Sequence, residues 1–116
     1  MSNTQVLPEK ARIAIIGGGI IGTSVAYHLA KRGIKDVVLI ERQQLTSGTT
    51  WHAAGLVSLS WATPTLTELA KYSHKLYASL EEETGQATGY KRIGSISLAR
   101  TEARLEEIKR TSSVCK

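Results

Sequence analysis

The sequence predicts an α/β fold whose first part is a parallel strand–helix–strand unit. An apolar run at 13–16 is stopped by a glycine cluster, a helical pattern continues to Gly33, and a second apolar run at 36–41 is closed by Glu41. Short, wholly apolar runs are typical of strands that are buried on both faces of a parallel sheet. The connection between two such strands is right-handed by default.

The helix of this unit is predicted between Ile20 and Gly33. Residues on one side of it recur at three- and four-residue spacing, namely Ile21, Val25, His28, Leu29 and Arg32. Gly33 is a natural stop, because glycine readily adopts the left-handed backbone that ends many helices. Residues 12–42 therefore make up the whole unit, and residues 43–62 are predicted to form a loop.

Residues 63–116 are predicted to form a helix, a strand and a second helix. Pro64 suits the first position of a helix, and Thr65 with Glu68 would form a capping box at its start. Leucines, alanines and a tyrosine then repeat at helical spacing as far as Gly85, which ends the helix.

The last two predicted elements are a strand at 94–100 and a helix capped by Thr101. Serine alternates with isoleucine and leucine in the strand, as in a half-buried strand, and Leu105 and Ile108 form the apolar stripe of the helix. The chain thus offers only two strands of a parallel sheet, whereas a self-sufficient domain of this type needs more. We expect residues 1–116 to be an incomplete domain, the N-terminal part of a longer protein.

Composition and charge argue against several classes of protein. Hydrophobic residues make up 41% of the 116 residues, which is ordinary for a folded protein. The net charge is +5, but the basic residues are scattered, so we expect no nucleic-acid partner. No stretch approaches the ~18 consecutive apolar residues of a membrane span. Cys115 is the single cysteine, and residues 1–12 look like neither a secretory signal nor a mitochondrial transit peptide, so we expect a cytoplasmic location.

Gly17, Gly19 and Gly22 form a G-x-G-x-x-G turn between the first strand and the helix. Gly17 permits the tight turn, Gly19 lets a pyrophosphate approach the backbone, and Gly22 lets helix and strand pack closely. The helix start offers free N–H groups and the positive end of the helix dipole to phosphates. Glu41 follows at close to the ~20 positions expected of a carboxylate that accepts hydrogen bonds from ribose hydroxyls and repels a 2′-phosphate.

These features predict a Rossmann-like dinucleotide site. The motif does not separate FAD from NAD, because both contain an ADP half. The alternative is a glycine-rich turn that only packs tightly.

Two parts of the sequence resemble a known family. The N-terminal fingerprint of FAD-dependent amine oxidoreductases of the D-amino-acid oxidase type is similar to "IAIIGGGIIGTSVAYHLAKRGIKDVVLIER". The narrower dimethylglycine dehydrogenase and sarcosine dehydrogenase family resembles this chain in "LTSGTTWHAAGLV" and "KLYASLEEETGQATGYKRIGSISLAR". The resemblance covers residues 12 to about 110, and "TTWHAAGL" is its most specific part.

The resemblance implies an FAD enzyme that oxidises an N-methyl amino acid by hydride transfer from the N-methyl carbon to flavin N5. A one-carbon unit would leave as formaldehyde or on tetrahydrofolate, for which only a full-length protein would carry a domain. The histidine that this family joins covalently to the flavin matches His52, and catalytic residues proper are expected beyond residue 116. Cofactor contacts are implied at Gly17, Gly19, Ile20, Ile21, Gly22, Glu41, Arg42, Gly48, Thr49, Thr50, His52, Ala54, Gly55 and Leu56.

Physical chemistry is compatible with this role for His52, but the residue type alone leaves it open. A covalent flavin needs a neutral imidazole nitrogen beside the flavin edge, and the small residues after His52 would leave room for that approach. Without the resemblance, His52 is more simply a loop histidine with an ordinary hydrogen bond, and Trp51 is expected to pack. His28 and His74 are expected to be surface or packing residues, and no residues have metal-ligand spacing.

Two other functions stay open at this point. One is a flavin amine oxidase that uses oxygen directly as its acceptor. The other is a truncated or regulatory homologue that binds FAD, or nothing, and catalyses no reaction, since fold does not determine activity. The sequence specifies neither the amine nor the electron acceptor.

Overall fold

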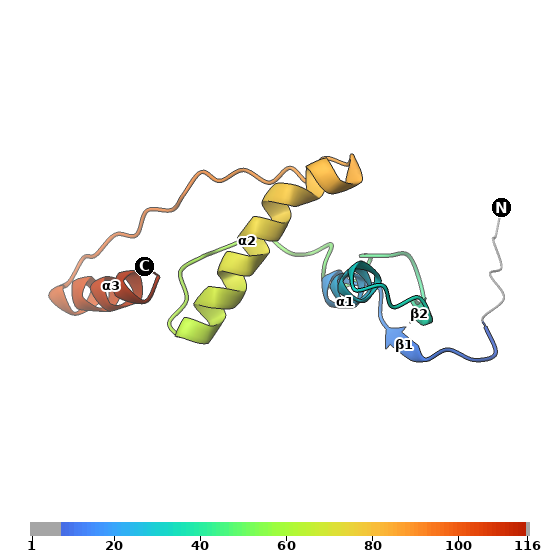
Figure 1. Ribbon diagram of the computed structural model, residues 1–116. Helices are drawn as coiled ribbons and strands as arrows, with labels where there is room; N and C mark the ends of the chain where they lie inside the picture. The colour runs from blue at the N-terminus through green and yellow to red at the C-terminus, as the bar shows by residue number, and fades with distance from the viewer. Residues whose placement is uncertain (1–7, 116) are drawn as a thin grey trace. The chain divides into compact units, whose positions relative to one another are not determined.

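The computed structural model describes residues 8–115, and the chain divides into two compact units on either side of the Ala54–Gly55 bond. Figure 1 shows the order β1, α1, β2, α2, α3 along the chain. Both strands and α1 belong to the first unit, and α2 and α3 belong to the second. The expectation that residues 1–12 carry no targeting signal falls largely on residues 1–7, which lie outside the described range.

The first unit is the predicted parallel strand–helix–strand unit. β1 spans Ile13–Ile16, α1 spans Ile20–Lys31 and β2 spans Val37–Ile40. The strands pair in parallel, and the register begins with Ile13 opposite Val37. The α/β class expected for this part of the chain is confirmed, with the strands and the helix in the predicted order.

Parallel pairing brings the segments that follow the two strands to the same edge of the sheet. The N–H of Gly17 donates to the carbonyl of Ile40 at 2.8 Å, so the pairing extends one residue beyond β1. Glu41 therefore lies beside the glycine turn, although the whole of α1 separates them in sequence. In open α/β sheets this edge is where ligands bind.

Close packing of α1 against the first strand depends on Gly22. A Cβ at Gly22 would lie 1.8 Å from the carbonyl oxygen of Gly17 and 3.4 Å from Ile15 Cγ2. Gly17 itself has a φ of 101°, a left-handed conformation that side chains disfavour. The structure confirms the turn expected at Gly17 and the packing expected at Gly22.

The predicted glycines end the first two helices. α1 ends at Lys31, and Gly33 follows with a φ of 76° and an N–H bonded to the carbonyl of Ala30 at 2.8 Å. Gly85 caps α2 in the left-handed conformation, and its N–H donates to the carbonyl of Glu81 at 2.9 Å. Both ends are satisfied in the manner common to helix C-termini.

α2 starts where it was predicted, but its capping residue lies two positions before the predicted one. α2 spans Pro64–Thr84, and Thr63 is its N-cap, with a hydroxyl that accepts a first-turn N–H at 3.4 Å. The predicted capping box of Thr65 and Glu68 is wrong, because Thr65 already lies inside the helix, past the position from which a side chain caps it. Pro64 occupies the first helical position, as expected.

The strand predicted at 94–100 does not form. The described residues provide it with no hydrogen-bonded partner strand, and Ile93, Ile96 and Leu98 are 89%, 92% and 81% exposed. Alternation shows which side chains would share a face, but a strand also needs a neighbour for its backbone groups. α3 follows at Glu102–Val114 and is capped by Thr101, as predicted.

Few side chains in residues 8–115 are buried. Ile15 and Ala70 are each 8% exposed and Thr67 is 1% exposed, whereas Ile16 on β1 is 87% exposed. Hydrogen bonds and glycine turns, more than an apolar core, therefore shape the site described below. Among the described helices, none combines the length and hydrophobicity that crossing a bilayer requires. That residues 1–116 form an incomplete domain stays a prediction.

We expect Gly22→Ala to lower the free energy of unfolding by about 3 kcal/mol or more, because the new methyl would overlap the Gly17 carbonyl. Urea unfolding followed by circular dichroism measures the change. Gly48→Ala is the matched control, since a Cβ at Gly48 meets nothing within 4 Å. Equal stability of the Gly22→Ala variant and the parent chain would contradict this account of the packing.

Candidate functional site

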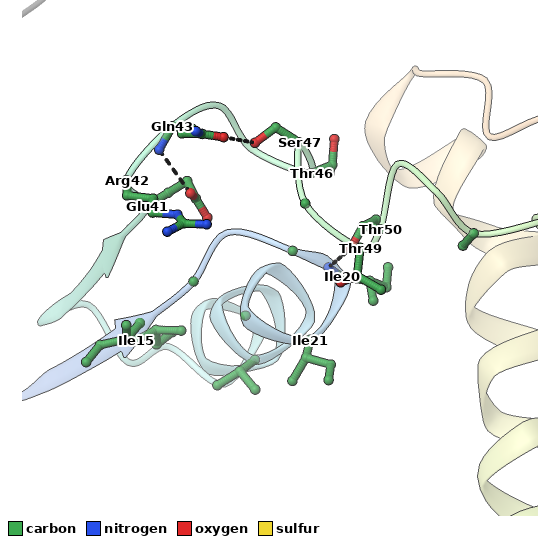
Figure 2. A pocket seen from close by; sticks show the side chains of 17 residues that line it. Ile15, Ile20, Ile21, Glu41, Arg42, Gln43, Thr46, Ser47, Thr49 and Thr50 are labelled. Carbon is green, nitrogen blue, oxygen red and sulfur yellow. Dashed lines mark hydrogen bonds between the residues drawn. The ribbon is translucent and has the colours of Figure 1, made fainter.

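A cleft of about 640 Å³ lies at the edge of the sheet where β1 and β2 end, which is within the size range of small-molecule sites. Figure 2 shows the glycine turn, the start of α1 and the segment after β2 around it. All of the lining belongs to the first unit: Ile15, Ile16, Gly17, Gly19, Ile20, Ile21, Gly22, Val25, Glu41, Arg42, Gln43, Thr46, Ser47, Gly48, Thr49, Thr50 and Ala53.

The start of α1 faces this cleft with an uncompensated positive dipole end. Its N-cap is Gly19, which has no side chain with which to cap the helix, and the first turn holds no acidic residue. Thr50, from the segment after β2, accepts the N–H of Ile20 at 2.9 Å through its hydroxyl oxygen (Figure 2). Most of the first-turn N–H groups thus remain suited to an anion.

Glu41 lies directly against the glycine turn. One carboxylate oxygen accepts the N–H of Gly18 at 2.6 Å and the other accepts the N–H of Gln43 at 3.0 Å. The hydrogen bond from Gly18, then that from Gln43, hold the pKa of the Glu41 carboxyl below its usual value, and the Arg42 charge adds to this. The side chain is therefore a carboxylate at neutral pH and retains lone pairs for further donors.

The segment after Glu41 folds back over the glycine turn. Thr46 donates its N–H to the carbonyl of Gly18 at 2.9 Å and accepts the N–H of Trp51 at 3.0 Å. Its φ of 67° makes it the single non-glycine residue of 8–115 with a left-handed backbone. Residues 48–53 then continue in tight turns, and they present Thr49, Thr50 and Ala53 to the cleft.

His52 is exposed and does not line the cleft. Its Nδ1 lies 3.0 Å from the carbonyl oxygen of Gly48. Because a carbonyl can only accept, this hydrogen bond requires the proton on Nδ1, which leaves the lone pair of a neutral ring on Nε2. Trp51, expected to pack, is 78% exposed, so that expectation is wrong for this unit.

The cleft brings together ten of the fourteen cofactor contacts implied by the sequence. His52 and Ala54 follow the cleft-lining loop but are not part of the lining, and Gly55 and Leu56 belong to the second unit. The ten that line the cleft are Gly17, Gly19, Ile20, Ile21, Gly22, Glu41, Arg42, Gly48, Thr49 and Thr50. Their contacts with a cofactor stay predictions.

Sequence reasoning missed several residues that line the cleft. Gln43, Thr46 and Ser47 lie between predicted contacts in the chain, so extending the implied loop backwards to Glu41 would have included them. Ile15, Ile16 and Val25 are apolar lining from β1 and α1, where nothing in the sequence distinguishes lining from ordinary packing.

Other candidate residues form no second site among residues 8–115. His28 bonds through its ring to the carbonyl of Ser24 within α1 at 2.6 Å. His74 of α2 contacts Tyr90 through a ring nitrogen and packs edge-on to its ring, which fits the expected packing role. No group of His, Cys, Asp or Glu in the described part of the chain is arranged to hold a metal ion.

Comparison with known proteins decides the family. The sequence pattern of the family described as FAD dependent oxidoreductase (DAO) matches residues 12–116. The chain belongs to this family. The resemblance seen in its glycine turn and in "TTWHAAGL" is thereby confirmed.

Three relatives illustrate the range of the family. The chain is 51% identical to the mouse pyruvate dehydrogenase phosphatase regulatory subunit over 97% of its length, and 52% identical to human dimethylglycine dehydrogenase over 87%. It is 43% identical to mouse sarcosine dehydrogenase over 97%. The chain spans only 13%, 12% and 12% of these three proteins.

A solved structure supports the fold. L-proline dehydrogenase from P. horikoshii matches 94% of this chain at 31% identity with a TM-score of 0.85, and this chain covers 28% of that protein. The fold of this chain is thus similar to part of a proline dehydrogenase.

The relatives contradict the expected cytoplasmic location. The mouse regulatory subunit, human dimethylglycine dehydrogenase and mouse sarcosine dehydrogenase are all named as mitochondrial. The expectation rested on the appearance of residues 1–12, and the character of a short terminal stretch does not identify a compartment.

We expect Glu41→Gln to lower stability at neutral pH and to have little effect in acid. The lowered pKa means that the Glu41 contribution is present above the ordinary carboxyl pKa and is lost as the pH falls through the folded-state pKa. Urea midpoints measured from neutral to acid pH test this. Glu9→Gln, the same charge change at an exposed position, is the control. A deficit that is as large in acid as at neutral pH would contradict the Gly18–Glu41 interaction.

Proposed function

We propose that this chain binds the ADP half of FAD in the cleft and serves an amine dehydrogenase of the dimethylglycine or sarcosine type. The observation that carries the proposal is the meeting of the glycine turn, the α1 start and Glu41 in a single cleft. The 52% identity to human dimethylglycine dehydrogenase supports the choice of substrate class, a small N-methyl amino acid.

The residues of the cleft fit the chemical groups of this cofactor. The free N–H groups at the start of α1, with the hydroxyls of Thr49 and Thr50, are donors for the pyrophosphate. Glu41 keeps unused lone pairs for the ribose hydroxyls, and its charge repels a 2′-phosphate. The exposed apolar side chains of Ile16 and Val25 provide surface for the rings.

We further propose that His52 is the covalent tether of the flavin. The hydrogen bond from Nδ1 to the Gly48 carbonyl holds the ring in the tautomer whose Nε2 lone pair is available for bonding to carbon. Ala53, Ala54 and Gly55 add little bulk next to it. The chemistry that FAD supplies when bound is acceptance of a hydride from the N-methyl carbon; this chain contributes binding and orientation.

A second candidate is a regulatory subunit that binds FAD without turnover. The observation that favours it is the 51% identity over 97% of this chain to the mouse pyruvate dehydrogenase phosphatase regulatory subunit. The residues proposed here to bind FAD serve both functions equally, because none of them carries out a proton or hydride transfer.

We expect FAD bound to the full chain to stay with the protein after acid precipitation, and His52→Ala to release it. Flavin absorbance of the pellet and of the supernatant measures the covalent fraction. His28→Asn is the matched histidine control, because His28 lies on α1 outside the cleft. Flavin retained by the His52→Ala variant would exclude His52 as the tether, and binding of NAD in preference to FAD would overturn the cofactor assignment.

Substrate oxidation separates the two candidate functions. The test needs a full-length protein that contains this chain, because the catalytic residues are expected beyond residue 116. Anaerobic addition of dimethylglycine or sarcosine to that flavin-loaded protein should bleach the visible flavin absorbance of a dehydrogenase. Stable flavin binding without bleaching by either amine favours the regulatory subunit.

A further inference from the structure

The loop at residues 44–53 is joined to the glycine turn by two long-range hydrogen bonds, one from Thr46 and one to Thr50. These bonds cross 28 and 30 positions of sequence, from Thr46 N–H to Gly18 and from Ile20 N–H to Thr50. Figure 2 shows both threonines on the loop beside the start of α1. The loop thus has a defined place on the turn through contacts within the protein itself.

Thr46 acts through its backbone. Its N–H bonds to the Gly18 carbonyl at 2.9 Å, and its own carbonyl accepts the Trp51 N–H at 3.0 Å. The two bonds form a continuous link from the glycine turn to the residue before His52. A φ of 67° directs both groups, and this conformation costs a non-glycine residue about 1 kcal/mol or more.

Thr50 acts through its side chain. α1 begins after Gly19, which has no side chain to cap the helix, and the Thr50 hydroxyl accepts the Ile20 N–H at 2.9 Å in its place. A hydroxyl oxygen in this role does what an N-cap side chain normally does. Its own proton remains free to donate elsewhere.

The loop lies close to two glycines of the turn, Gly18 and Gly19, at positions where a side chain would meet it. A Cβ at Gly18 would lie 2.5 Å from Leu45 Cδ2, and a Cβ at Gly19 would lie 3.0 Å from the Thr50 hydroxyl oxygen. Gly18 is one of the variable positions of the G-x-G-x-x-G pattern, so ligand approach does not account for a glycine there. Leu45 of the loop, together with Glu41 Cβ at 3.1 Å, leaves little room for a side chain there.

We propose that Thr46 and Thr50 are positioning residues, which fasten the 44–53 loop to the glycine turn and thereby hold His52 in place. The part that concerns His52 rests on the proposed function. From Trp51 the chain continues to His52, whose N–H bonds to Thr49 at 3.1 Å and whose ring bonds to Gly48 at 3.0 Å. Among the described residues, both of these hydrogen bonds of His52 therefore come from the loop that the two threonines fasten.

Two pairs of variants test the proposal on the full chain. Thr50→Val removes the hydroxyl at constant shape, and Thr50→Ser keeps it. Thr46→Pro removes the N–H and cannot adopt a positive φ, whereas Thr46→Gly keeps the N–H and adopts that φ freely. Thr50→Val and Thr46→Pro should weaken the attachment of the loop to the glycine turn. Thr50→Ser and Thr46→Gly should preserve it.

Amide hydrogen exchange measures how firmly the hydrogen bonds of Thr46 and Thr50 hold the loop, and it needs no cofactor. We expect the Ile20 N–H to exchange about two- to tenfold faster in Thr50→Val, the effect of one lost hydrogen bond. The Trp51 N–H is shared between the carbonyls of Thr46 and Gly48, at 3.0 and 3.1 Å, and it should exchange about two- to tenfold faster in Thr46→Pro because the bond to Thr46 is lost. Exchange at Ile15 and Ala30, in β1 and α1, reports whether the first unit is still folded. Unchanged Ile20 and Trp51 exchange, or equal effects of serine and valine, would overturn the proposal.

Acid precipitation of FAD-loaded variants measures the covalent fraction of the bound flavin, which depends on the position of His52. We expect Thr50→Val and Thr46→Pro to lower the covalent fraction of the bound flavin severalfold while serine and glycine retain it. A normal covalent fraction in a variant with fast exchange would show that the fastening does not hold His52, which overturns the proposal. If the parent chain binds FAD without any covalent bond, the tether fails, and the hydrogen-exchange result still decides whether the two threonines fasten the loop.

Discussion

The site depends on Gly18, because both of its backbone groups are bonded to the segment that follows β2. Its N–H donates to the Glu41 carboxylate at 2.6 Å and its carbonyl accepts the Thr46 N–H at 2.9 Å. A Cβ on Gly18 would lie 2.5 Å from the end of the Leu45 side chain and 3.1 Å from Glu41 Cβ, so these side chains would have to move to admit it. The glycine turn therefore binds the polypeptide segment after β2 at two points, in addition to the phosphate role proposed for it.

The parallel sheet makes this meeting of segments unavoidable. Because β1 and β2 run in the same direction, the chain leaves both at one edge, and Gly17 and Glu41 become neighbours there. The start of α1 opens at the same edge with free N–H groups. This edge of the sheet therefore brings together the Glu41 carboxylate, the positive end of the α1 dipole and the loop at residues 44–53. Residues 8–115 bury few side chains, so this meeting does not depend on a large apolar core.

The family relationship fits a protein part that binds and orients. Relatives that share this region include proteins named as dehydrogenases and a protein named as a regulatory subunit. Binding of a dinucleotide, the role proposed for this region, would be useful to both, since the groups that hold a cofactor differ from the groups that react on it.

The sequence predicted correctly those elements that are set by residues close together in the chain. Apolar runs, the glycine spacing and Thr101 predicted β1, α1, β2 and the cap of α3 correctly, because each is set by residues a few positions apart. The strand at 94–100 failed for the opposite reason: alternation is local, but a strand requires a partner that the described residues do not provide. The capping box failed by two residues, since Thr63 and Thr65 are equally suitable in composition.

The sequence by itself predicted the fold class and the position of the proposed cofactor site from the G-x-G-x-x-G turn and the acid after β2, and it indicated the family through these residues together with "TTWHAAGL". Only the tertiary structure showed how the loop at residues 44–53 and Glu41 are attached to the glycine turn. The left-handed Thr46, the capping of α1 by Thr50 and the two bonds to Gly18 join residues that are distant in the chain. No local pattern marks such contacts, because they exist only after the parallel strands have brought the two segments to the same edge.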